Sequence, residues 1–99
     1  MAESIESVCD ANEDCDVVVL HWCGLRDHNA VVRFSSLSDA SECVRVLATT
    51  GFTATSISTV ALVGEQRIEA LVGVHSDDLS RIGQASEVMR AANAHVWEF

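Results

Sequence analysis

The feature that most constrains this chain is a strand–helix–strand pattern that occurs twice. Residues 38–50 and 77–92 carry apolar side chains at helical spacing, and each segment lies between β-branched runs. The flanking strands are predicted at 30–34, 53–63, 67–75 and 94–99. The strand ends AVVRFSS and ALVGVHS also resemble each other, which indicates a weak internal repeat.

Two such units joined by a short turn at 64–66 predict an α+β fold. The order βαββαβ is that of a ferredoxin-like two-layer sandwich, with both helices on one face of an antiparallel sheet. The β-branched run at 17–23 predicts an extra N-terminal strand, and its place in the sheet stays open. With 99 residues we expect one domain at 17–99, preceded by an acidic arm at 1–16.

The helix ends carry recognisable capping residues. Ser36 or Ser38 is expected to cap the first helix, and Gly51 suits a left-handed C-terminal cap. Ser76 or Asp77 is expected to cap the second helix. The predicted core stripes are Ala40, Cys43, Val44 and Leu47 on the first helix, and Leu79, Ile82, Ala85, Met89 and Ala92 on the second. The mixed faces of residues 53–63 predict an edge strand.

Residues 30–58 and 70–96 resemble the two halves of an ACT-type regulatory domain, in which strand, loop and helix precede a glycine-led strand. In that family a glycine usually opens the first helix, where amino-acid ligands meet the backbone. This chain has SLSDAS at 36–41 instead. The resemblance therefore implies the fold and a way of pairing sheets in dimers more than it implies a ligand.

The chain is strongly acidic, with a formal charge of −9 from fifteen acids and six arginines. Such a balance lacks the basic footprint that binds nucleic acid or an anionic membrane. It suits either a basic protein partner or a salt-rich cytoplasm. The acidic start is unlike a signal peptide, so we expect a cytoplasmic protein with reduced thiols.

Soft ligands gather in the stretch CDVVVLHWCGLRDH, residues 15–28. Cys15, His21, Cys23 and His28 are candidate zinc ligands, because thiolate and imidazole are the groups that zinc prefers. No CxxC pair is present, however, and cysteine is commonly a small buried apolar residue. A packed structural strand is the competing interpretation.

A second candidate site lies at the two turns where a strand passes into a helix. Ser35 and Ser36 occupy the first turn, and His75 and Asp77 the second. Loops at such positions often hold functional groups, so these side chains could line a polar ligand pocket. Ordinary helix capping is the alternative.

The sheet face not covered by helices is the candidate interface. We expect it to expose the apolar residues Trp22, Leu71, Trp97 and Phe99, which a second copy could cover. The leading interpretation is thus a small homodimeric regulatory or adaptor domain without cofactor. The alternatives are a small-ligand or metal sensor, and a small enzyme with His75 or His95 as acid or base. The motifs GxGxxG, HExxH and GxSxG are absent from the sequence.

Overall fold

Five strands and two helices make up the residues that the computed structural model describes, which are 16–65, 67–92 and 95–99. The α+β class is therefore confirmed. In chain order the elements are β1 (Asp16–His21), β2 (His28–Phe34), α2 (Leu37–Thr50), the 3₁₀ turn η1 (Ala54–Ser56), β3 (Ile57–Val63), β4 (Ile68–Ser76), α3 (Leu79–Ala92) and β5 (Val96–Glu98). Apart from Asp16, the predicted acidic arm lies outside the described residues.

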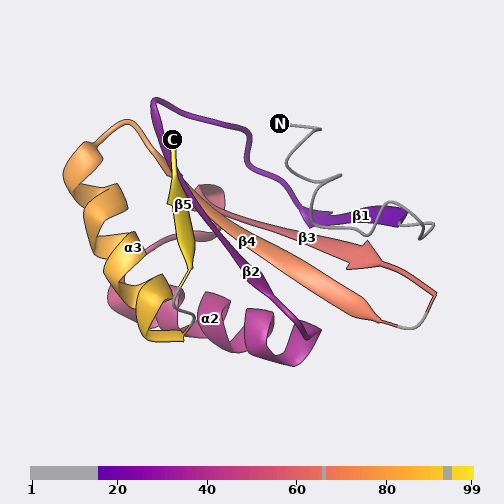
Figure 1. The fold of residues 1–99 in the computed structure, drawn as a ribbon. Coiled ribbons are helices and arrows are strands. Elements are labelled where there is room, and N and C mark those ends of the chain that lie inside the picture. The colour runs from indigo at the N-terminus through magenta and orange to yellow at the C-terminus, as the bar shows by residue number, and fades with distance from the viewer. Residues whose placement is uncertain (1–15, 66, 93–94) are drawn as a thin grey trace.

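The strands form one antiparallel sheet in the order β1-β3-β4-β2-β5 (Figure 1). The two central pairings are long. Strand β4 pairs with β2 from Phe34 opposite Ala70 to His28 opposite Ser76, and with β3 along the whole of β3. Among the described strands, β1 pairs with β3 alone and therefore lies at one edge of the sheet. The sequence analysis had left the place of this strand open.

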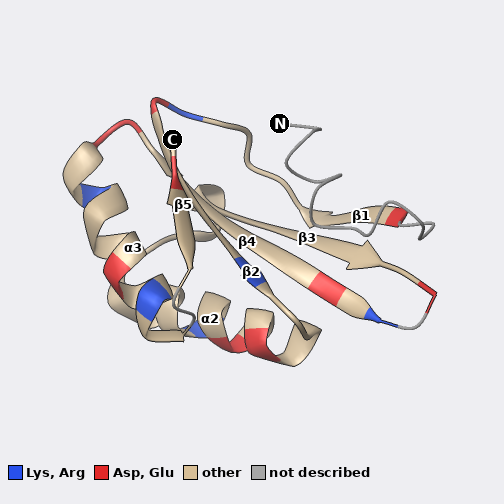
Figure 2. Cartoon of the chain, in the orientation of Figure 1, with Lys and Arg blue, Asp and Glu red and all other residues tan. Residues whose placement is uncertain are grey.

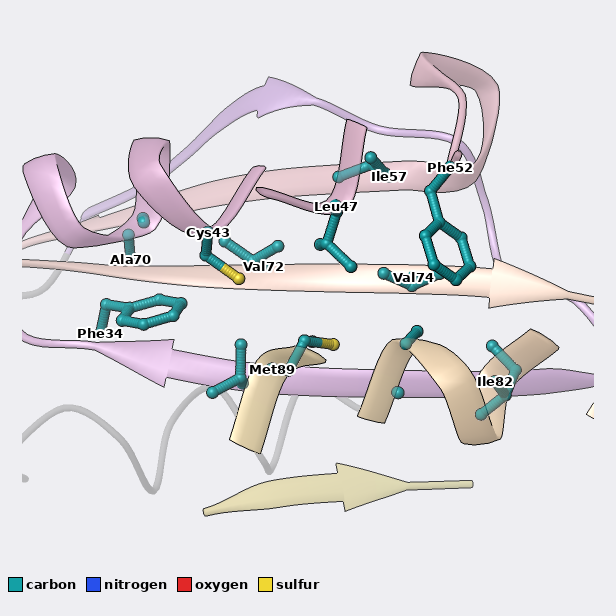
Figure 3. Packing of buried hydrophobic residues seen from close by; sticks show 14 residues of the cluster. Phe34, Cys43, Leu47, Phe52, Ile57, Ala70, Val72, Val74, Ile82 and Met89 are labelled. Carbon is teal, nitrogen blue, oxygen red and sulfur yellow. The ribbon is translucent and has the colours of Figure 1, made fainter. Parts of the chain in front are cut away.

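Both helices cover the same face of the sheet (Figure 1). Figure 3 shows side chains of α2 and α3 meeting those of β2 and β4, with Leu47 and Met89 fully buried between the layers. Burying a side chain of this size contributes about 1.5–3 kcal/mol. Because alternate strand residues point to opposite faces, the residues between these core positions lie on the face without helices.

Helix α2 follows the prediction closely. The Ser36 hydroxyl accepts a hydrogen bond from the Asp39 amide at 3.1 Å, and Gly51 has the left-handed φ of 112°. Ala40, Cys43 and Leu47 are buried as predicted, and Val44 is partly buried against them.

The start of α3 differs from the prediction. Ser76 or Asp77 was predicted as the cap, but the capping residue is Asp78, whose carboxylate accepts the Ser80 amide at 2.9 Å. The Ser76 hydroxyl instead accepts the amide of Asp78, ahead of the helix. The helix therefore begins at Leu79, which is 61% exposed, so the prediction that Leu79 belongs to the core stripe was wrong. Ala92, at the other end of that predicted stripe, is also exposed. Ser86 takes a buried place on the stripe beside Ile82, Ala85 and Met89.

Two strand predictions also need correction. Residues 54–56 form a 3₁₀ turn, so β3 begins at Ile57; and β3 is an inner strand, because β1 pairs along its outer side. Strand β1 ends at His21, so Trp22 and Cys23 lie in the connection to β2. Within the described residues no helix is long and apolar enough to cross a membrane.

Candidate functional site

Three buried polar side chains form a hydrogen-bonded chain on the sheet face without helices. His75 of β4 lies between Ser58 of β3 and Asn29 of β2, with Nε2 2.8 Å from the Ser58 Oγ and Nδ1 2.8 Å from the Asn29 Oδ1. These side chains are exposed by 1%, 2% and 4% respectively. Buried polar groups that are fully paired specify one arrangement, because each lost partner is costly.

The neighbours of Asn29 fix where the protons of this chain lie. The Asn29 amide group donates to the main-chain oxygens of Arg26 and Phe99 at 2.9 and 3.2 Å, while its Oδ1 accepts the Arg26 amide at 3.0 Å. The Oδ1 therefore accepts from Nδ1–H of His75. When the ring is neutral, its Nε2 is then the acceptor of the Ser58 hydroxyl.

Burial keeps His75 neutral. Removal from water lowers its pKa below 6.5, and the positive charge of Arg26 lowers the pKa further. The ring fits because residue 73 is glycine. A Cβ at Gly73 would lie 3.3 Å from the His75 ring atoms, closer than such contacts normally come.

The connection between β1 and β2 lies over the hydrogen-bonded side chains of Ser58, His75 and Asn29 and contacts them. The Cys23 amide donates to the Ser58 Oγ at 3.0 Å, and Trp22 makes a T-shaped contact with the His75 ring. The Arg26 guanidinium adds a bond to the Thr55 main-chain oxygen at 3.3 Å. We refer to residues 22–27 as the covering segment.

Ser58, His75 and Asn29 have the connectivity of a nucleophile, a base and a residue that orients the base. Two observations oppose that chemistry in the present arrangement. The Ser58 Oγ already accepts a backbone amide, and it is buried under the covering segment. In this arrangement the three hydrogen-bonded side chains hold the covering segment in place and do not present a hydroxyl to a substrate.

Of the predicted metal ligands that the structure describes, His21 and Cys23 meet and His28 lies apart from them. His21 Nε2 and Cys23 Sγ both point at the Ala54 main-chain oxygen, at 2.9 and 3.1 Å. His28 lies on β2, three strand spacings from β1 and so roughly 14 Å away. Cys15 lies outside the described residues, and among those described no group of three or more potential ligands occurs.

The predicted polar pocket is not assembled. His75 pairs opposite Asn29 near the start of β2, whereas Ser35 and Ser36 follow the other end of that strand. Because β2 and β4 are antiparallel, the two strand–helix turns lie at opposite ends of the sheet. Ser36 caps α2, and Asp77 accepts the Asp27 amide at 3.3 Å.

The predicted interface residues lie on or beside the face without helices. Trp22, Trp97 and Phe99 are between 43% and 55% exposed, and Leu71 is half-buried. The larger apolar surface is one that the sequence analysis missed. Val17, Val18, Val19 and Leu20 of β1 are each at least 42% exposed, on both faces of the strand.

The β-branched run that predicted β1 was the available signal for this surface. Its meaning depends on position: the same run is core in an inner strand and an exposed apolar edge in an outer one. In Figure 2, β1 carries charge at one end only.

Comparison with known proteins adds no relative, since no family model, curated protein or solved structure matches this chain.

Proposed function

We propose that this protein is a small acidic regulatory or adaptor domain that acts by association, and that it pairs with a second copy of itself through β1. The observation that carries the proposal is the exposed apolar edge. Strand β1 pairs with β3 on one side, stands last in the sheet, and presents four consecutive aliphatic residues to solvent. Unpaired edges of this kind recruit another strand.

The sequence of β1 complements itself in antiparallel pairing. If a two-fold axis passes between Val18 and Val19, each Val18 lies opposite the partner's Val19. The register of β1 against β3 shifts between Val19 and His21, so regular pairing with a second copy covers the valines and does not extend to His21.

The order of strands and helices is the basis for the fold class that we propose. Without β1, the strands run β3-β4-β2-β5, with α2 joining β2 to β3 and α3 joining β4 to β5. We assign this βαββαβ arrangement to the ferredoxin-like class, with β1 added at one edge. The resemblance to ACT-type domains stays a prediction.

The first test is sedimentation velocity of the full chain from about 10 to 300 micromolar, because a single short strand pair supports only a modest affinity. We expect a monomer–dimer equilibrium. Val19→Glu places two carboxylates close to the proposed axis and should abolish the dimer. Leu79→Glu is the matched control, since it changes charge equally at an exposed position on α3. A monomeric wild type, or a Val19→Glu protein that dimerises normally, would refute the proposal.

The salt dependence of association distinguishes the proposed dimer from a complex with a basic protein. Each copy carries a formal charge of −9, so two copies repel, and added salt should strengthen the dimer by screening. A complex with a basic protein should instead weaken as salt is added.

The second candidate is a soft-metal sensor at His21 and Cys23, favoured by the convergence of both side chains on the Ala54 oxygen. A single Zn²⁺ could take the imidazole nitrogen, the thiolate and the carbonyl oxygen after small shifts of the turn η1. Zinc titration followed by melting temperature tests this. Stabilisation by zinc that disappears in Cys23→Ser and persists in His28→Gln would support the site.

A further inference from the structure

Strand β1, the edge that we propose for association, is held at one end by the buried hydrogen-bonded side chains of Ser58, His75 and Asn29. Strand β1 has no buried residue of its own, and it continues directly into Trp22 and Cys23. Those two residues contact His75 and Ser58. The position of β1 therefore depends on its pairing with β3 and on how firmly the covering segment is attached.

We propose that protonation of His75 detaches the covering segment and so weakens pairing through β1, which makes association pH-dependent. The inference rests on the proposed dimer and names its regulation. Histidine is the side chain suited to such a switch, because its charge changes near neutral pH.

Protonation reverses the direction of one hydrogen bond. Neutral His75 accepts the Ser58 hydroxyl at Nε2; the imidazolium must donate there instead. The Ser58 Oγ would then face two donors, Nε2–H and the Cys23 amide, and its own hydrogen would need a new acceptor within a buried site. Moving the covering segment away relieves this conflict and lets water reach the charged ring.

The charges around His75 favour the same response. Arg26 lies on the covering segment and disfavours a second positive charge. The other ionisable side chains on the adjoining elements are Cys23 and Asp27 of the covering segment, Asp16 and His21 on β1, His28 and Arg33 on β2, Glu69 on β4 and Asp77 beyond β4. Asp77 accepts the Asp27 amide. Among the described residues, the His75 ring contacts Ser58, Asn29 and Trp22, and none of these side chains carries a charge that would stabilise an imidazolium.

The test is sedimentation velocity of the full chain at about pH 7.5 and about pH 5.5, which lie on either side of the ordinary histidine pKa. We expect the dimer dissociation constant to rise severalfold at the lower pH, because only the neutral His75 ring accepts the Ser58 hydroxyl that holds the covering segment. His75→Gln should lose this dependence, and His21→Gln should keep it. Arg26→Gln removes the charge that disfavours the imidazolium, so it should move the midpoint to higher pH.

Two failures are distinguishable. A wild type that is monomeric at about pH 7.5 overturns the dimer and, with it, this regulation of it. A dimer whose pH response is the same in wild type and His75→Gln overturns the switch and leaves the dimer standing. If His75→Gln does not fold, Arg26→Gln decides, since that side chain is exposed: an unmoved midpoint overturns the proposal.

Discussion

The rings of Trp22 and His75 meet in a T-shaped contact, with centroids 5.7 Å apart and planes inclined at 67°. Trp22 is 55% exposed, while the histidine beneath it is 1% exposed. An exposed aromatic on the covering segment therefore shields a buried titratable group on the sheet. This contact joins the surface that we propose for association to the polar chain that positions it.

The first prediction concerns stability against pH. Folding lowers the His75 pKa below 6.5, so the neutral form is favoured in the folded state. Its contribution is fully present above the unfolded pKa and is lost as pH falls from about 6.5 through the lowered folded pKa. Urea unfolding at several pH values should show this decline for wild type and not for His75→Gln. Parallel curves for both proteins would contradict it.

The second prediction compares two buried serines. Ser58→Ala leaves the His75 Nε2 and the Cys23 amide without their partner, so we expect a loss of about 1–3 kcal/mol in unfolding free energy. Ser86 is the matched control, because its buried Oγ has no hydrogen-bond partner among the residues that the structure describes. Ser86→Ala should be neutral or stabilising, as alanine also favours a helix. Equal effects would contradict the importance of the Ser58 bonds.

Local signals in the sequence predicted much of the fold. Helical spacing predicted α2 to within a residue of its start, and Gly51 marked its end. The start of α3 was less determined, because Ser76, Asp77 and Asp78 can all cap a helix and only tertiary contacts decide among them. Asp77 is engaged with the covering segment, which leaves the cap to Asp78.

The candidate site was less predictable. His75 was chosen for its position at a strand end, but its partners Ser58 and Asn29 lie on other strands, and their meeting depends on sheet register. Register follows from long-range pairing and is not written in any one segment. His21 and Cys23 were predicted as candidate zinc ligands on one β-branched run; they meet at Ala54 although Cys23 lies beyond the strand.

The third prediction concerns Cys43, which lies on the buried face of α2. Burial raises the pKa of its thiol to about 11, so very little thiolate forms at neutral pH. We expect iodoacetamide to leave Cys43 unmodified in the native protein and to alkylate it once urea unfolds the chain. Peptide mapping by mass spectrometry measures this site separately from the other cysteines. Rapid native labelling of Cys43 would place that thiol outside the core.

The last prediction compares two glycines of the helices. Gly51 has φ of 112°, a conformation that strains a residue with a Cβ, and its amide bonds the Ala48 oxygen at 3.2 Å as α2 ends. Gly51→Ala should therefore lower the unfolding free energy by about 1 kcal/mol or more. Gly83 lies inside α3 with open space around the Cβ position, so Gly83→Ala should raise it by about 0.5–1 kcal/mol. Thermal or urea unfolding of both variants measures the difference. Because both changes add the same methyl group, opposite signs isolate the backbone effect, and a shared sign would show that packing outweighs it at one of the sites.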